Sequence, residues 1–131
     1  MKLFHGWLSS ASRRVRLCLA EKGIAYESVS IDLAKQEHHS ANFLAMNPNG
    51  VVPALLLDDA RPLHESSTIC EYLDDLHPLP PLRPTDAYQR AVMRNFVRYT
   101  APISNYDLLL NASAVSGGYV NAREDSTPPV Q

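Results

Sequence analysis

The sequence contains few cysteines, no long apolar run and no secretory leader pattern, and each absence narrows the class of protein. Cys18 and Cys70 are the two cysteines among 131 residues, and they lie far apart in segments with helical spacing. Such usage does not fit a disulfide-stapled scaffold and favours a reducing, cytoplasmic location. No apolar run approaches the roughly 20 residues that a membrane-spanning helix needs, and the first residues lack the basic and apolar regions of a signal peptide. We therefore expect no membrane partner.

The chain also lacks a strong excess of charge of either sign. Twelve Lys and Arg against fourteen Asp and Glu give a formal net charge of −2, which gives no reason to expect nucleic acid as a partner. The five histidines show no metal-ligand spacing and there is no C-x-x-C, so the sequence predicts no metal site and does not support a redox dithiol. Three arginines near the N-terminus are predicted to be solvated or ion-paired, with binding of an anionic substrate as the minor alternative: Arg13, Arg14 and Arg16.

The segment from Asn47 to Leu76 carries the clearest local pattern. A turn-rich tetrapeptide at 47–50 precedes an apolar run at 54–57, a polar turn at 58–61 and a short return segment at 62–64. Two short runs across so tight a turn are typical of an antiparallel hairpin. A helix is predicted to begin at Glu65-Ser66, because apolar residues then recur along one helical face: Ile69, Tyr72, Leu73 and Leu76.

The residues before this segment predict a strand, a helix and a second strand. Met1 to His5 is the first strand, residues 6–10 break it, and Ser10 or Ser12 is the expected cap of the following helix. Gly23 has the place of its C-terminal cap, and residues 26–31 form the second strand. A short helix is expected near the end of residues 32–46. The order β-α-β-α-β-β-α predicts an α/β fold with a mixed four-stranded sheet, in which the first two strands are parallel and the hairpin adds antiparallel edges.

A proline-rich stretch divides the chain. Residues 78–84 hold four prolines and are predicted to link a first domain, residues 1–77, to a partial helical domain, residues 85–131. Apolar and aromatic residues keep helical spacing from 85 to 99, and Pro102 is expected to kink or end that helix. The tail from Ala112 shows no sustained period, so we assign no regular structure to residues 117–131.

Three short motifs, taken in their order and spacing, resemble the cytosolic glutathione transferases. Residues 9–16, SSASRRVR, resemble the serine-rich signature of the zeta class, the maleylacetoacetate isomerases. Val52-Pro53 resembles the cis-proline step of the family, and Glu65-Ser66 resembles the start of its glutathione-anchoring helix. The resemblance implies a thioredoxin-like domain followed by the start of an all-α domain, with glutathione as co-substrate.

The resemblance implies a catalytic role for the serine pair. Ser9 matches the serine that donates a hydrogen bond to the glutathione sulfur and so favours the thiolate, assisted by the dipole of the helix that begins just after it. Ser10 is the neighbouring candidate, and the sequence does not separate the two. Taken without the resemblance, both serines are most simply helix caps.

The resemblance also implies binding roles further along the chain. The main chain of Val52, before a cis Pro53, would pair with the cysteinyl part of glutathione like an added strand. Ser66 would take the γ-glutamyl carboxylate and Glu65 would face the ammonium group. Three residues lie where the glycyl carboxylate would be met: His38, His39 and Asn49.

Two departures from the family qualify the expected function. Ala11 replaces the cysteine that follows the serine pair in zeta-type sequences, which disfavours thiol-exchange chemistry. Family members also continue through further helices that build the substrate wall and much of the homodimer contact, so helix 88–99 is expected to expose apolar surface here. The resemblance implies an enzyme that adds glutathione to a small electrophilic substrate, as a zeta-like isomerase or a β-etherase. The alternative is a non-catalytic glutathione-binding module.

Overall fold

The computed structural model describes residues 1–99. The predictions for Pro102 and for the tail from Ala112 lie outside the described residues. The predicted element order is confirmed for the described part. The elements are β1 Lys2–His5, α1 Ser10–Glu21, β2 Glu27–Ser30, η1 Glu37–His39, α2 Ala41–Met46, β3 Ala54–Leu56, β4 Pro62–His64 and α3 Ser66–Leu76.

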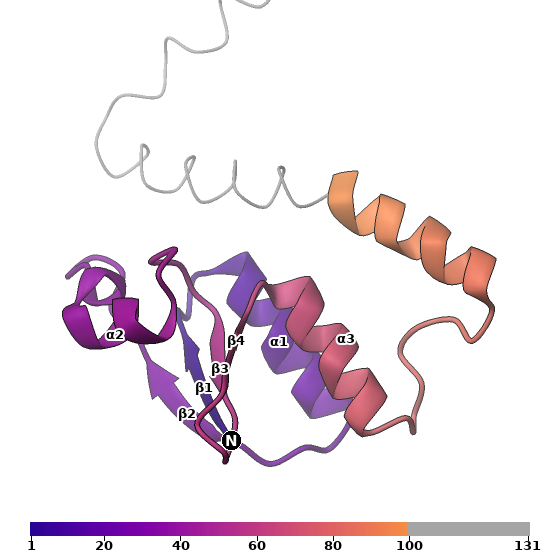
Figure 1. Ribbon diagram of the computed structural model, residues 1–131, viewed down its shortest axis with the longest axis horizontal. Helices are drawn as coiled ribbons and strands as arrows, with labels where there is room; N and C mark the ends of the chain where they lie inside the picture. The colour runs from indigo at the N-terminus through magenta and orange to yellow at the C-terminus, as the bar shows by residue number, and fades with distance from the viewer. Residues whose placement is uncertain (100–131) are drawn as a thin grey trace, which may run out of the picture.

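The four strands form one mixed sheet in the order β2-β1-β3-β4 (Figure 1). Strands β1 and β2 are parallel, as the β-α-β connection requires, and β3 runs antiparallel to both of its neighbours. The sequence placed both hairpin strands at an edge. In the structure only β4 is an edge, because β3 pairs with β1 as well as with β4.

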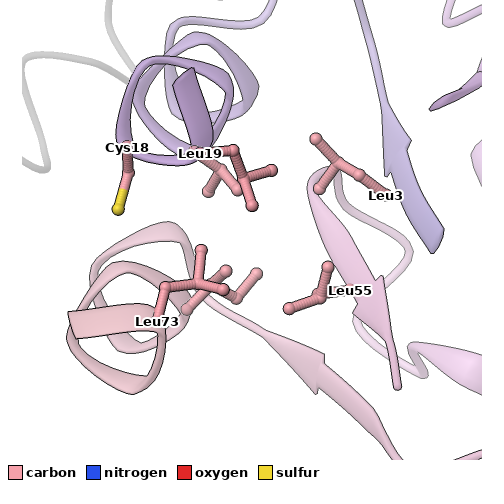
Figure 2. Close-up of a cluster of buried hydrophobic side chains, with 7 residues drawn as sticks. Leu3, Cys18, Leu19, Leu55 and Leu73 are labelled. Carbon is pink, nitrogen blue, oxygen red and sulfur yellow. The ribbon is translucent and has the colours of Figure 1, made fainter. Parts of the chain in front are cut away.

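Helices cover both faces of this sheet (Figure 1). Because side chains alternate along a strand, Leu3 points to one face of the sheet and Phe4 to the other. Phe4 contacts Phe43 of α2 edge-on, with ring centroids 6.4 Å apart. The opposite face, covered by α1 and α3, holds the main core, where the leucines of the sheet point toward those of the two helices (Figure 2). Its buried members are Leu3, Val15, Cys18, Leu19, Leu55, Ile69 and Leu73.

The N-cap of α1 is Ser9, the first of the three serines that the sequence offered as caps. It accepts a hydrogen bond from the Ser12 amide at 3.1 Å, whereas Ser10 and Ser12 lie inside the helix. The Ser12 hydroxyl instead accepts from the Gly6 amide at 3.3 Å. The predicted C-terminal cap is confirmed, because Gly23 has φ +62°. The Ile24 amide then donates back to the Leu19 carbonyl at 3.0 Å, which closes the helix end.

The proline-rich segment is fastened to the first domain by a buried ion pair. Lys22 Nζ lies 2.5 Å from Asp74 Oδ1, and both side chains are buried. Lys22 also donates to the carbonyls of His77 at 2.6 Å and Pro80 at 2.9 Å. Arg83 pairs with the other oxygen of Asp74 at 3.0 Å. The Lys22–Asp74–Arg83 cluster therefore fixes residues 77–83 against α1 and α3.

Residues 87–99 are helical and follow this segment (Figure 1). Arg94 joins this helix to α3 through an ion pair with Glu71 at 2.6 Å. Its aromatic residues remain largely exposed, at 72% for Tyr88, 68% for Phe96 and 79% for Tyr99. The expectation of an exposed apolar surface on this helix is confirmed.

Candidate functional site

Strand register brings the three predicted site segments to one end of the sheet. Ala54 pairs with Phe4 on one side and with His64 on the other. The end of β1, the start of β3 and the end of β4 therefore lie together. The serine segment follows β1, Val52-Pro53 precedes β3, and Glu65-Ser66 follows β4. The sheet thus places all three beside the N-termini of α1 and α3.

The two serines differ in exposure. Ser9 is fully buried, and its oxygen accepts the capping hydrogen bond while its own hydroxyl proton remains to be donated. Ser10 is the first residue of α1 and is half-buried. Both hydroxyls lie at the positive end of the helix dipole, where a thiolate is favoured over a thiol.

The turn before β3 has the geometry that the sequence suggested. The Val52–Pro53 peptide bond is cis, as predicted, and Pro53 is buried. Asn47, which the sequence interpretation did not single out, organises this turn. Its buried amide donates to the Val51 carbonyl at 2.7 Å and its oxygen accepts from the Asn49 amide at 3.2 Å. The sequence could have indicated this role, because an Asn that begins an NPNG turn commonly hydrogen-bonds to the main chain two residues further along.

The residues predicted to bind the glycyl end of glutathione lie at or beside this turn. His39 and its neighbour His38 form a tilted ring pair with centroids 4.0 Å apart. A Cβ added at Gly50, where φ is +59°, would lie 3.0 Å from the His39 ring, so a larger residue there would be strained and would push against His39. Asn49 is exposed on the same turn. The structure therefore brings His39 and Asn49 to the segment that precedes Val52.

Helix α3 begins in an unusual backbone conformation. Glu65 occupies the N-cap position with φ 71° and ψ 110°, a left-handed value that costs a non-glycine residue about 1–3 kcal/mol. Its exposed side chain makes no capping hydrogen bond. The first amides of α3 therefore have no side-chain cap from Glu65, whereas Ser66 is buried at the same helix end. Uncapped helix amides favour an anion such as a carboxylate.

The three arginines of α1 differ in exposure and in their hydrogen-bond partners. Arg13 is exposed, in agreement with the prediction, but Arg14 and Arg16 are half-buried. Among residues 1–99, neither of these two forms an ion pair. The prediction that they are solvated or ion-paired is wrong for both, because each is hydrogen-bonded to uncharged groups.

Arg16 holds the segment that carries the serines. Its guanidinium donates to the carbonyls of Gly6 and Trp7, both at 3.2 Å, and lies 4.8 Å from the centre of the Trp7 ring. It also contacts His5 Nδ1 at 3.1 Å. Because a guanidinium only donates, Nδ1 must be the acceptor, so Nε2 carries the proton and donates to Ser28 Oγ at 2.7 Å. His5 is therefore neutral in this arrangement.

We expect His5 to resist protonation. Burial, together with the nearby Arg16 charge, holds the pKa of His5 below its usual value. The unfolded chain then binds the proton more readily, so the free energy of unfolding should fall as pH drops below about 6.5 and level off below the folded pKa. A ring-proton NMR titration of His5 should show the lowered midpoint, and Arg16→Gln should move it upward. A His5 midpoint that does not change in Arg16→Gln would contradict the contact.

The two cysteines lie away from these segments. Cys18 and Cys70 line a cavity of about 290 Å³ between α1, α3 and helix 87–99, with Leu17, Leu82, Met93 and Val97 among the other walls. The contact with Cys18 and burial both raise the pKa of the Cys70 thiol. This protonated thiol is a poor nucleophile. No cluster of metal-ligating side chains and no helix long and apolar enough to cross a membrane occurs within the described residues.

The mixed sheet, the cis-proline turn and the two helix N-termini define a thioredoxin-like domain with an anion-favouring site at one end. The family described as "Glutathione S-transferase, N-terminal domain" matches residues 8–76. The chain therefore belongs to the glutathione S-transferase family through this domain.

The chain also matches named relatives from plants and bacteria. The chain is 42% identical to Glutathione S-transferase Z2 of Arabidopsis thaliana over 92 residues, covering 70% of this chain and 41% of that protein. It is 42% identical to Maleylacetoacetate isomerase of Pseudomonas aeruginosa over 93 residues, covering 70% and 44%. The chain thus spans about two fifths of the length of these two relatives.

Solved structures agree with this assignment. A maleyl pyruvate isomerase of the zeta class superposes with a TM-score of 0.74 at 36% identity, covering 89% of this chain and 57% of that one. Maleylacetoacetate isomerase from Methylobacterium extorquens, solved with malonate and GSH bound, gives a TM-score of 0.73 at 42% identity, covering 77% and 47%. The thioredoxin-like fold expected from the sequence is therefore confirmed.

Proposed function

We propose that this chain is the glutathione-binding part of a glutathione transferase-type enzyme. The enzyme activates the glutathione thiol for attack on, or addition to, a small electrophilic organic substrate. The observation that carries the proposal is the convergence of three segments at one end of the sheet, beside two helix N-termini. In the proposed arrangement residues 1–77 bind glutathione, residues 78–84 are the linker, and residues 85–131 begin a helical domain.

The residues present fit the ligand along its length. At neutral pH glutathione has a carboxylate at each end, an ammonium group at the γ-glutamyl end and a thiol in the middle. The start of α3 offers the buried Ser66 hydroxyl and helix amides to the γ-glutamyl carboxylate. In this proposal the main chain at Val52-Pro53 binds the central cysteinyl part. The N-terminus of α1, with Ser9 and Ser10, contacts the sulfur. His39 and Asn49 meet the glycyl end.

The names of the relatives favour an isomerase of the zeta type, in which the thiolate adds reversibly to an unsaturated acid. A β-etherase is the second candidate, because the chain is 40% identical over 101 residues to Protein LigF of a Sphingobium species. We propose a cytoplasmic enzyme that forms a homodimer when the helical domain is complete. A binding module without turnover remains the competing function.

Calorimetric titration with glutathione tests the binding, and a conjugation assay with a generic aryl chloride tests turnover. S-methylglutathione should bind comparably, because the anchors lie away from the sulfur. Binding without conjugation would favour the module, and absence of binding would refute both functions.

Ser66→Ala should weaken both ligands by about tenfold, because a carboxylate loses one charge-assisted hydrogen bond of about 1.5 kcal/mol. Thr68→Ala, at an exposed position of the same helix, is the matched control and should change little. The affinities are measured by the same titrations. If Ser66→Ala affected only the free thiol form, Ser66 would act at the sulfur and not at the γ-glutamyl end.

A further inference from the structure

The packing of α1 against α3 brings Cys18 and Cys70 together. They are 52 residues apart in a sequence that has no C-x-x-C motif, so their spacing did not indicate a dithiol. Cys18 points from α1 toward α3 (Figure 2), and the two thiols are in hydrogen-bond contact. Cys18 Sγ lies 4.0 Å from the Cys70 carbonyl oxygen, and Cys70 Sγ lies 3.9 Å from the Arg14 carbonyl oxygen. The fold therefore creates a pair of free thiols.

The pair borders a space that a small molecule can enter. Both cysteines line the cavity of about 290 Å³ between α1, α3 and helix 87–99, which is open to solvent. The surface that faces this cavity is almost entirely apolar. Its volume is several times the roughly 30 Å³ that one water molecule occupies in the liquid, so a small organic molecule fits. An apolar wall favours an uncharged oxidant over a charged one.

The two thiols differ in acidity. The hydrogen bond with Cys70, assisted by the Lys22 ammonium group, holds the pKa of the Cys18 thiol below its usual value, although burial and the Asp74 charge oppose this. The same contact and burial raise the pKa of the Cys70 thiol. Because the thiolate is the nucleophile, Cys18 is the thiol that attacks, and Cys70 is held beside it as a protonated partner.

We propose that Cys18 and Cys70 form an oxidation site for small organic hydroperoxides, at which they close reversibly to a disulfide between α1 and α3. The Cys18 thiolate attacks the terminal peroxide oxygen, so that an S–O bond forms, the O–O bond breaks and the alkoxide leaves and takes up a proton. Cys70 then attacks the sulfenic acid at Cys18, so that an S–S bond forms and the S–O bond breaks. The Cys70 proton leaves with the hydroxyl group as water. The two thiols together lose two electrons, and the hydroperoxide is reduced to an alcohol and water.

Neither step uses the residues proposed to bind glutathione, so the inference goes beyond the proposed function and does not depend on it. The disulfide would join the two helices whose N-termini lie at the proposed glutathione site. If the cysteines were only small apolar residues of the core, their thiols would not react as a pair.

The experiment treats the reduced 131-residue chain with tert-butyl hydroperoxide. Wild type is compared with Cys18→Ser, Cys70→Ser and Ser67→Ala, a control that alters the cavity wall without removing a thiol. Because the chain has two cysteines, thiol counts and intact masses carry no background from others. Dimedone traps sulfenic acid, peptide mapping locates the disulfide, and melting curves are recorded for every variant. The same reactions are repeated in urea.

Wild type and Ser67→Ala should lose both thiols together, remain single chains and recover both thiols with dithiothreitol. Cys70→Ser should stop at a sulfenic acid on Cys18, which dimedone captures. Cys18→Ser should keep its remaining thiol about tenfold longer than wild type, because protonated Cys70 is a poor nucleophile. In urea the two single variants should react at similar rates, since the fold creates the difference between the cysteines.

Three results would overturn the inference. The first is folded wild type that keeps both thiols at hydroperoxide concentrations that oxidise the chain in urea. The second is a Cys18→Ser protein whose Cys70 is oxidised as fast as in wild type. The third is oxidation that links two chains or ends in sulfinic acid without a disulfide between Cys18 and Cys70. None of these results bears on glutathione binding, which the titrations test separately.

Discussion

Lys22→Met is expected to lower the free energy of unfolding by about 3–5 kcal/mol. The Lys22 side chain is fully buried. Its ammonium group pairs with the Asp74 carboxylate and donates hydrogen bonds to the carbonyls of His77 and Pro80. Methionine removes the charge and all three hydrogen bonds, which leaves a buried carboxylate poorly compensated. The remaining pair between Arg83 and Asp74 should keep the loss toward the lower end of this range. Urea unfolding at neutral pH measures it.

The loss should depend on pH in a defined direction. Burial raises the pKa of Asp74, but hydrogen bonds from Lys22 and Leu82 and the charges of Lys22 and Arg83 outweigh it and hold that pKa below its usual value. The stability that this carboxylate contributes is therefore present above about pH 4 and is lost as pH falls through the lowered folded pKa. The difference between wild type and Lys22→Met should shrink over the same interval.

Two variants control this result. Lys35→Met removes an exposed lysine whose ion pair with Asp32 spans 3.4 Å, and it should cost less than about 1 kcal/mol. The double variant Lys22→Met/Asp74→Leu removes both buried charges and should recover part of the stability, because an apolar pair replaces an ionic one. A Lys22→Met protein as stable as Lys35→Met would show that the buried pair contributes little.

Ser9→Ala should raise the thiol pKa of bound glutathione by about one to two units, equivalent to about 1.4–2.7 kcal/mol. The conjugation rate near neutral pH should fall by about ten- to a hundredfold and recover as pH rises, because the thiolate is the nucleophile. Glutathione affinity should change little, since the proposed anchors are Val52, Glu65 and Ser66. The pH profile of thiolate absorbance for the bound ligand is the deciding measurement.

The capping role of Ser9 requires its own control. Alanine removes the hydrogen bond to the Ser12 amide and should cost about 0.5–2 kcal/mol of stability irrespective of ligand. Ser9→Thr keeps both the cap and a hydroxyl, and it should preserve the thiolate profile. Ser10→Ala tests the half-buried neighbour. If Ser10→Ala shifted the profile and Ser9→Ala did not, the half-buried Ser10 hydroxyl would be the activating one. If neither shifted it, a serine hydroxyl would not activate the thiol.

Local patterns were sufficient to predict the order of the elements, and the reason is physical. Helical periodicity in α3 and the glycine that ends α1 act within one or two turns, so neighbouring residues decide them. The sequence left the N-cap of α1 undecided, because Ser9, Ser10 and Ser12 are all competent caps within four residues. The backbone decided among them through the Gly6 carbonyl, which accepts from the Ser9 amide at 3.2 Å.

Long-range polar contacts could not be predicted in the same way. Lys22 and Asp74 are 52 residues apart, and nothing near either residue distinguishes a buried ion pair from two solvated charges. The same holds for Arg14 and Ser66. The cis bond before Pro53 was predicted through the family resemblance, since a lone X–Pro sequence is cis in only about 5% of cases. The individual roles of the site residues remain predictions.

The position of Trp7 has a practical consequence. It is the single tryptophan of the chain, two residues before Ser9, and its ring contacts both the Arg16 guanidinium, 4.8 Å from the ring centre, and the His5 ring, with which it forms a T-shaped pair. The protein therefore carries a built-in optical reporter beside the proposed thiol site. Emission excited at the indole band belongs to this one loop, so ligand arrival and His5 protonation are both readable in solution without attaching a label.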